Sequence, residues 1–432
     1  MSVEKNIYLL NYNGLSGKEG HCLIIIFPEL IIFPEYGGGT MVSYCSQRRG
    51  VQGKEGEGCG SMVRVALLKV DNYQEKLVRE SMVTALSLLG ITEDFFHGKK
   101  VLLKPNFLAA SPVEKAVCSH PAVVGGIASV VKEMKGRVEV GDSPGFGSVF
   151  KVAESCGVAA PLRELNVPLV SLEDGIQASF PQGEVCKAFT LGRRVKEVDK
   201  IISVARLKTH NLTKYTGAVK NLYGCISGRH KASLHLRYNQ VELFSRMLAD
   251  LLGAVRPDLS LVDGIVSMEG PGPRKGNPRF TGFIVMSQDA VAADVVACKT
   301  VGINPEEVLH LKYAGEKGWG EKDLKNIEIV GDKEESIQVK GFKKADSHSP
   351  MTGPVPSFLV RFLRNYFVPL PEIIPGKCQS CGICAHSCPP GIIEVKKDRV
   401  AEIDMRGCIR CYCCQELCPH EAVTLKRRWV FK

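Results

Sequence analysis

The sequence has no long apolar run. A membrane-spanning helix needs roughly 18 to 20 consecutive apolar residues. The closest stretch, residues 22–33, is interrupted by Pro28 and Glu29. The chain also shows no secretory segment, and reducing compartments keep cysteines free of disulfides. We therefore expect no membrane span and free thiols.

The sequence also lacks a Walker A string and any long cluster of basic residues. The missing Walker A pattern argues against a P-loop nucleotide site. The formal charge of +10 counts cysteines as neutral, and the lysines and arginines are spread along the chain. The one tight basic run, Lys426 to Arg428, suits a solvated end, with a docking patch for an acidic redox partner as the alternative. We expect no nucleic-acid partner.

One cysteine string occurs twice near the carboxyl end. Both copies have the spacing C-x2-C-x2-C-x3-C-P, which directs three thiolates to one cubic iron–sulfur cluster and the fourth to its partner. The ligands are Cys378, Cys381, Cys384 and Cys388 in the first copy, and Cys408, Cys411, Cys414 and Cys418 in the second. Eight thiolates so close together would repel one another unless iron and sulfide neutralised them. The spacing predicts two 4Fe-4S clusters.

Structural zinc and disulfides are the alternatives, and both fit the spacing less well. Zinc ribbons use paired C-x2-C knuckles with a longer gap, so they need neither the third cysteine nor the Cys-Pro ending. Proline after each fourth cysteine fixes φ and turns the chain away from the cluster. Using Cys413 in place of Cys414 would lengthen the last gap, so we interpret Cys413 as a non-ligand packed nearby.

Residues 371–432 resemble a bacterial-type two-cluster ferredoxin domain, a small α+β fold with an internal repeat. The resemblance implies that the ligands cross over between the copies. One cluster would be held by Cys378, Cys381, Cys384 and Cys418, and the other by Cys408, Cys411, Cys414 and Cys388. It also implies a redox partner protein.

Residues 62–345 alternate between strand and helix patterns. Apolar strands such as Val101 to Leu103, Ile201 to Leu207 and Leu259 to Val262 each run out into polar residues. This order predicts an α/β domain with a mostly parallel sheet covered by helices, in which ligands bind at the carboxyl ends of the strands.

Polar residues at these strand ends are the candidate catalytic groups: Lys104, Asn106, Lys208, His210 and Asp263. Lysines and an amide suit an anion or a carbonyl, and histidine titrates near neutrality. A lone lysine or histidine is more often structural, but a position directly after an apolar strand favours a site. The loop from Gly141 to Gly145 precedes a helix and is a second candidate for binding an anion through its backbone.

Seven strings of this domain resemble the family called domain of unknown function 362. They are Lys104-Pro-Asn, Ser119-His-Pro, Gly141-Asp-Ser-Pro-Gly, Leu207-Lys-Thr-His, the stretch Thr216 to Gly224, Met268-Glu-Gly-Pro-Gly-Pro, and Asp289 to Asp294. Members are often joined to a two-cluster ferredoxin tail. The resemblance implies architecture and cofactor but no substrate, and it gives no residue a role.

Two segments lie outside these domains. Residues 1–61 contain a direct repeat, IIFPE at 25–29 and 31–35, followed by a glycine-rich and basic run. We expect a leader outside the fold, with translation starting at Met62. The alternative is an arm that binds a membrane surface or a partner. Residues 346–370 are punctuated by prolines and are interpreted as a semi-rigid connector.

Two functions remain open at this point. The first is a redox enzyme or redox-dependent maturation factor, in which the clusters pass single electrons to a small molecule at the strand ends. The second is a non-catalytic electron-transfer subunit or iron–sulfur carrier that docks a partner protein. Low-potential clusters near a surface are oxygen-labile, so we expect a cytoplasmic protein of an anaerobe.

Overall fold

The computed structural model describes residues 62–228, 230–337, 339–345, 369–396 and 399–426, and the backbone of 6–13, 19–27 and 30–31. It divides into two compact units, residues 1–60 and 61–432. The first unit contains an antiparallel sheet of β1 (Asn6–Asn13), β2 (Glu19–Phe27) and β3 (Leu30–Ile31). Whether residues 1–61 are a leader stays a prediction. Of the expected connector, only Pro369 and Leu370 fall within the described residues.

A nine-stranded sheet forms the centre of the second unit, in the order β14-β4-β13-β12-β10-β5-β6-β7 with β11 paired to β10. The strands are β4 (Val63–Lys69), β5 (Lys100–Pro105), β6 (Arg137–Asp142), β7 (Leu169–Ser171), β10 (Lys200–His210), β11 (Lys214–Thr216), β12 (Leu259–Glu269), β13 (Asn277–Ser287) and β14 (Ile327–Gly331). Along this order only β13 runs against its neighbours, β12 and β4. The expected mostly parallel sheet is confirmed.

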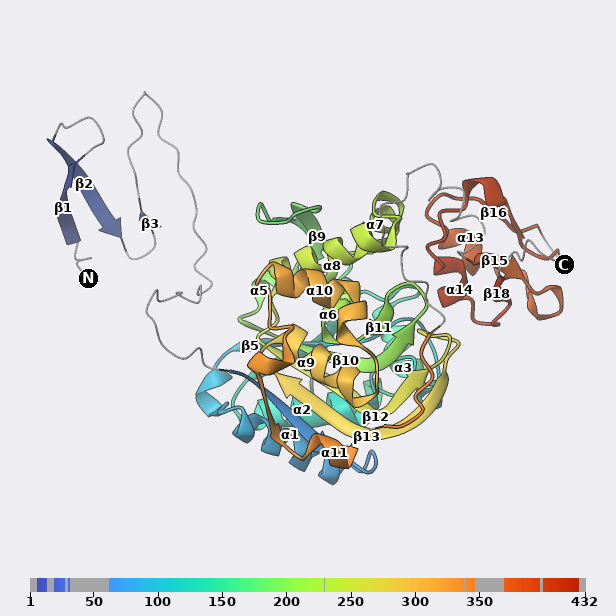
Figure 1. The fold of residues 1–432 in the computed structure, drawn as a ribbon, viewed down its shortest axis with the longest axis horizontal. Coiled ribbons are helices and arrows are strands. Elements are labelled where there is room, and N and C mark those ends of the chain that lie inside the picture. The colour runs from blue at the N-terminus through green and yellow to red at the C-terminus, as the bar shows by residue number, and fades with distance from the viewer. Residues whose placement is uncertain are drawn as a thin grey trace. The chain divides into compact units, whose positions relative to one another are not determined.

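Helices cover both faces of this sheet (Figure 1). One face packs against α1 (Glu75–Leu88), α2 (Pro121–Glu133), α3 (Val149–Ser155) and α4 (Ala159–Glu164). The other packs against α6 (Ala218–Asn221), α8 (Val241–Val255), α9 (Ala290–Thr300) and α10 (Leu309–Glu316). Because both faces are covered, β10 is buried along almost its whole length, which explains its continuous apolar run.

Smaller elements complete the unit. They are β8 (Gly175–Ser179), β9 (Ala188–Gly192), α5 (Arg194–Glu197), α7 (His230–Arg237) and α11 (Glu334–Ile337), with short 3-10 turns between the main elements. Within the described ranges, no helix is both long and apolar enough to cross a membrane.

The C-terminal module, residues 369–426, shows the repeat that the cysteine strings predict. It contains β15 (Leu370–Ile373), α13 (Ile383–His386), β16 (Ile393–Glu394), β17 (Glu402–Ile403), α14 (Cys413–Leu417) and β18 (Val423–Lys426). The strands β16 and β17 form a short hairpin, and β15 pairs with β18. Each short helix follows a residue in the left-handed region, Gly382 or Tyr412, so the two halves turn in the same way.

Candidate functional site

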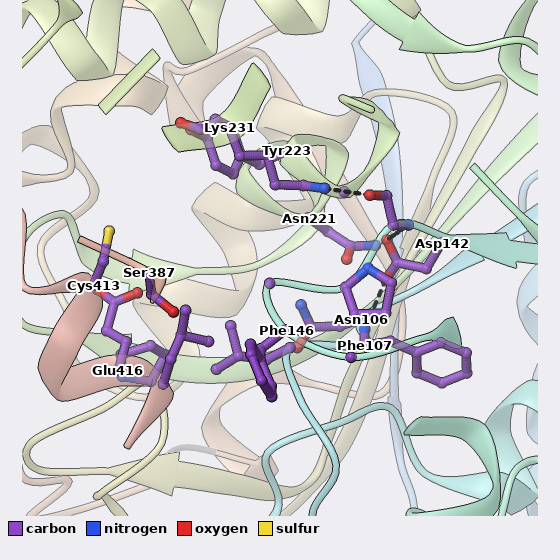
Figure 2. A pocket seen from close by; sticks show the side chains of 18 of the residues that line it. Asn106, Phe107, Asp142, Phe146, Asn221, Tyr223, Lys231, Ser387, Cys413 and Glu416 are labelled. Atoms are coloured by element: carbon purple, nitrogen blue, oxygen red, sulfur yellow. Dashed lines mark hydrogen bonds between the residues drawn. The ribbon is translucent and has the colours of Figure 1, made fainter. Parts of the chain in front are cut away.

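A cavity of about 900 Å³ lies where the carboxyl ends of β5, β6 and β10 meet the C-terminal module. Three of the predicted residues line it: Lys104, Asn106 and Lys208. Figure 2 shows Asn106, Asp142 and Asn221 facing Ser387, Cys413 and Glu416 of the module across this space. The three predicted residues therefore lie together at the carboxyl edge of the sheet, where ligands bind in parallel sheets.

A buried ion pair fixes one wall of this cavity. The Lys104 ammonium lies 3.0 Å from an Asp142 carboxylate oxygen, and the two side chains are 1% and 2% exposed. Lys104 also donates to Asn221 Oδ1 at 3.3 Å, while Asp142 accepts from the backbone N–H of Phe107 and Ser143. A buried pair persists only when further hydrogen bonds satisfy both charges, as here.

A residue with a side chain would not fit at position 224, next to the ion pair of Lys104 and Asp142. A Cβ at this position would lie 2.0 Å from Asp142 Oδ1 and 2.5 Å from Lys104 Nζ. The glycine at the end of the Thr216 to Gly224 string thus lets the chain approach the ion pair closely.

The short helix α6 carries the residues of the next wall, and Asp294 on α9 holds it in place. The buried Asp294 carboxylate accepts from the N–H groups of Ala218 and Val219 and from the Tyr215 hydroxyl. A Cβ on Gly217 would lie 2.1 Å from this carboxylate. Asp294 therefore sets the direction in which α6 presents Lys220 to the cavity.

Lys220 lines the cavity, and no described residue forms a hydrogen bond or an ion pair with its ammonium group. Burial lowers its pKa, and the Glu416 carboxyl acts in the opposite direction. The hydroxyl of Thr216, also in the lining, is buried and without a partner among the described atoms. Thr216 is buried and Lys220 is half-buried. A partly desolvated ammonium beside an unpaired hydroxyl suits a bound anion.

Two further lysines reach the cavity. The Lys208 ammonium donates to Asn106 Oδ1 and to the Val117 carbonyl at 2.7 Å, and burial lowers its pKa to about 7. Lys231 of α7 donates to the Ser143 hydroxyl at 2.5 Å, and burial lowers its pKa to about 8. Such pKa values let an amine change its charge near neutral pH, as acid–base groups do.

The loop from Gly141 to Gly145 does not offer free backbone donors. The N–H of Ser143 donates to Asp142 and to the Gly224 carbonyl, and the N–H of Gly145 donates to the Leu108 carbonyl. Its letters match a G-x-S-x-G string, but Pro144 has no N–H for an oxyanion hole. The loop contributes the Asp142 and Ser143 side chains instead.

The C-terminal module docks on the loops beyond β10 and β12 through α14. Asn211 donates to Gln415 at 3.2 Å, and Arg274 donates to the Leu417 carbonyl at 3.0 Å. Lys275 donates to the carbonyls of Glu421 and Val423. Side chains from the module thereby form part of the cavity wall.

His210 lies at this interface and does not line the cavity. Its Nδ1 accepts from the N–H groups of Leu212 and Thr213, and its Nε2 lies 3.3 Å from Glu416 Oε1. Burial lowers the pKa of His210 well below its usual value, and burial raises the pKa of Glu416 to about 7. With Nδ1 accepting, the ring proton belongs on Nε2, which lies near Glu416 without forming a hydrogen bond to it.

Asp263 lies away from the cavity. Its carboxylate is 3.5 Å from the Arg206 guanidinium and accepts from the Tyr73 hydroxyl at 2.9 Å. Asp263 and Arg206 are buried, and Tyr73 is half-buried. The sequence pattern predicted that Asp263 lies at the end of a strand, at the edge of the sheet. In the structure β12 continues beyond it to Glu269, so the Asp263 side chain lies in the protein interior. Glu269 likewise forms an ion pair with Arg279 at 3.0 Å.

Two small cavities in the module are lined by the predicted ligands. One is lined by Cys378, Cys381, Cys384 and Cys418, and the other by Cys388, Cys408, Cys411 and Cys414. Each set combines three cysteines of one string with the fourth of the other. Among the described residues, no three Cys, His, Asp or Glu side chains are close enough to hold a single metal ion.

Comparisons with known proteins agree with this arrangement. The family model described as Domain of unknown function (DUF362) matches residues 101–299, and the model of a 4Fe-4S dicluster domain matches 377–422. The Thylakoid-associated protein sll1697 of Synechocystis sp. is 34% identical over 246 residues, which cover 56% of this chain and 76% of that protein. The chain belongs to the DUF362 family.

A DUF362 domain is here joined to a 4Fe-4S module, as the motifs predicted. A ferredoxin of Methanothermococcus thermolithotrophicus is 33% identical over 52 residues, covering 12% of this chain and 87% of the ferredoxin. The solved structure of the lactate racemase apoprotein from Thermoanaerobacterium thermosaccharolyticum aligns with a TM-score of 0.34 and 12% identity, covering 56% of each chain.

Proposed function

We propose that the chain is an iron–sulfur oxidoreductase that holds two 4Fe-4S clusters and passes single electrons to a small anionic or carbonyl-bearing substrate. One observation carries the proposal. The cavity that contains the strand-end lysines is also lined by Ser387 and Cys413, which are the sequence neighbours of the proposed ligands Cys388 and Cys414. Substrate and cluster would therefore be separated by a single layer of protein.

The cysteine arrangement supports two clusters. Cys378, Cys381, Cys384 and Cys418 would hold the first, and Cys408, Cys411, Cys414 and Cys388 the second. These sulfurs surround two hollow sites, whereas zinc draws four sulfurs to about 2.3 Å from one ion. The clusters, when bound, supply one electron each.

The protein residues would hold and polarise the substrate. Lys220 and Thr216 offer an ammonium and a hydroxyl that have no partner among the described residues. An anionic group would accept a hydrogen bond from each of them. Lys208 and Asn106 lie in the same lining and could orient a carbonyl oxygen. Because Lys208 and Lys231 have lowered pKa values, either can deliver a proton as an electron arrives.

Electrons would enter through the first cluster from a redox partner protein. Its proposed ligand Cys381 is exposed, while the second set lies near the cavity, because Cys413, the neighbour of the proposed ligand Cys414, lines it. This gives an order of partner, first cluster, second cluster and substrate. The cytoplasmic location stays a prediction.

The test uses the full chain with its clusters, prepared without oxygen and reduced with dithionite. Pools of carboxylates, phosphorylated metabolites and carbonyl compounds are screened for reoxidation of the clusters. We expect Lys220→Met to slow reoxidation by the active compound about 10-fold or more, because a hydrogen bond to a charged group contributes about 1.5–3 kcal/mol. Lys76→Met, at a lysine whose side chain is 88% exposed, is the control and should react like wild type.

Two outcomes contradict this function. If no small molecule reoxidises the clusters and only a partner protein does so, the chain is an electron carrier. If Lys220→Met and Lys76→Met react equally fast with the active compound while both cluster spectra are intact, the cavity is not the site.

A further inference from the structure

A serine hydroxyl and a lysine ammonium meet at the wall of the large cavity. Ser143 Oγ and Lys231 Nζ are hydrogen-bonded at 2.5 Å, and both residues line the cavity. Figure 2 shows Lys231 extending toward the loop that carries Asp142. Ser143 and Lys231 are 88 positions apart in the sequence, so only the fold brings them together.

The serine is held in place by hydrogen bonds on both its backbone and its hydroxyl. The N–H of Ser143 donates to Asp142 Oδ1 at 2.7 Å and to the Gly224 carbonyl at 3.1 Å. The N–H of Gly228 donates to Ser143 Oγ at 3.1 Å. A hydroxyl has one proton and two lone pairs. A charged Lys231 donates to the second lone pair of Oγ, and a neutral Lys231 can accept the Oγ proton.

Contacts of α7 with the core fix the position of the lysine. The Tyr223 hydroxyl donates to the Lys231 carbonyl at 2.8 Å, and the Tyr223 ring meets the His235 ring edge to face at 5.5 Å. His235 in turn stacks on Phe244 of α8, with the ring centroids 4.5 Å apart. The amine therefore approaches Ser143 from a packed helix.

The surroundings of Lys231 let its amine lose a proton close to neutral pH. Burial lowers the pKa of Lys231 to about 8; Asp142 raises this pKa, Lys104 lowers it further, and Glu173 raises it. Roughly a tenth of such amines are neutral at pH 7, whereas an ordinary lysine is almost wholly charged. A neutral base within hydrogen-bond distance of a hydroxyl is the arrangement that activates a serine nucleophile.

We propose that Ser143 and Lys231 are the nucleophile and the general base of a site that hydrolyses esters or thioesters in this cavity, an activity beyond the proposed electron transfer. Lys231 takes the Oγ proton as Oγ bonds to the carbonyl carbon. The bond from this carbon to the leaving oxygen or sulfur breaks, and the leaving group takes the proton from Lys231. Water then attacks the acyl-serine and gives a proton to Lys231, which returns it to Oγ. No oxidation or reduction occurs.

The surroundings of Ser143 favour a substrate with a good leaving group. Amide hydrolysis relies on N–H groups that stabilise the oxyanion. Next to Ser143, Pro144 has no N–H, and the N–H of Gly145 is bound to the Leu108 carbonyl. The Lys104 ammonium supplies positive charge in the same lining. Alcohols and thiols leave more readily than amines, so esters and thioesters need less of this stabilisation.

The first experiment needs no variant. The cluster-loaded wild-type chain is incubated without oxygen with diisopropyl fluorophosphate, whose phosphorus bonds to an activated serine oxygen as fluoride leaves. Peptide mass spectrometry then locates the adduct. We expect one adduct per chain, on Ser143, with a rate that rises with pH and levels off above about pH 8, where Lys231 is neutral. A chain without an adduct on Ser143 would overturn the proposal.

The second experiment measures hydrolysis of p-nitrophenyl acetate. Ser143→Ala removes the nucleophile, and Lys231→Arg keeps a positive charge that cannot be deprotonated. General-base catalysis contributes about 100-fold or more, so each variant should hydrolyse the ester at least about 100-fold more slowly than wild type. Lys76→Met, at a side chain that is 88% exposed, is the control and should match wild type. A wild-type rate in Lys231→Arg would contradict the role of Lys231 as the base.

Both experiments run with oxidised clusters, because the reaction needs no electrons. Cluster absorbance and circular dichroism show that each variant is folded. If Ser143 stays unlabelled while a small molecule reoxidises the reduced clusters, the ester-hydrolysing site is refuted and the proposed function stands. Labelling and hydrolysis in a chain whose clusters no small molecule reoxidises would support this site and contradict the proposed function.

Discussion

The ion pair between Lys104 and Asp142 gives the sharpest prediction for the DUF362 domain. Asp142→Asn removes the negative charge but keeps the size of the side chain. The Lys104 ammonium, whose side chain is 1% exposed, is then left buried without a counter-ion. Breaking a buried pair in this way costs about 3–5 kcal/mol. We expect a loss of this size in the free energy of unfolding.

The assay is urea unfolding of the cluster-loaded chain without oxygen, followed by far-ultraviolet circular dichroism. The matched control is Asp174→Asn, which breaks an ion pair of 2.8 Å with Arg193 at side chains that are 69% and 49% exposed. Water screens such a pair, so we expect little change. The m-value should stay constant in both variants.

The reasoning is refuted if Asp142→Asn unfolds at the same urea concentration as Asp174→Asn. A second variant separates charge from packing. Adding Lys104→Met to Asp142→Asn removes the uncompensated cation, so the double variant should be more stable than Asp142→Asn alone. A double variant that is the less stable of the two would show that Lys104 contributes mainly through other contacts.

Three further predictions concern α6, Lys208 and the odd cysteine. Gly217→Ala should lower the free energy of unfolding by about 1–3 kcal/mol, because the new Cβ would lie 2.1 Å from Asp294 Oδ1; urea unfolding measures this. Lys208 has a pKa of about 7 in the folded chain and an ordinary value of 10.5. Between pH 7 and pH 10.5 the unfolded chain therefore binds more protons, and the free energy of unfolding should rise with pH. Lys208→Met should flatten this rise. In iron analysis, Cys413→Ala should keep its iron, whereas Cys414→Ala should lose the iron of one cluster. A flat profile in wild type, or iron loss in Cys413→Ala, would contradict the respective prediction.

The sheet, and the edge of it at which three of the candidate residues meet, were predictable from the sequence because apolar runs ending in polar residues are local features. Lys104, Asn106 and Lys208 follow or end such runs, and all three line the cavity. Asp263 has the same pattern, but β12 continues beyond it to Glu269, so its side chain packs inside against Arg206. Where a strand ends depends on its neighbours in the sheet, which local periodicity does not contain.

The rest of the site depends on contacts between distant segments. Lys231 lies on α7 without any local motif, and it reaches Ser143 only because the two segments pack together. Glu416 lies inside the second cysteine string, where spacing explains the cysteines but not the residues between them.

The most direct test of the central claim is metal and sulfide analysis of the full chain purified without oxygen. The account predicts about eight iron atoms and eight acid-labile sulfides per chain, with a broad brown absorbance that bleaches on reduction. Zinc in place of iron, or an absorbance that does not respond to reduction, would contradict it.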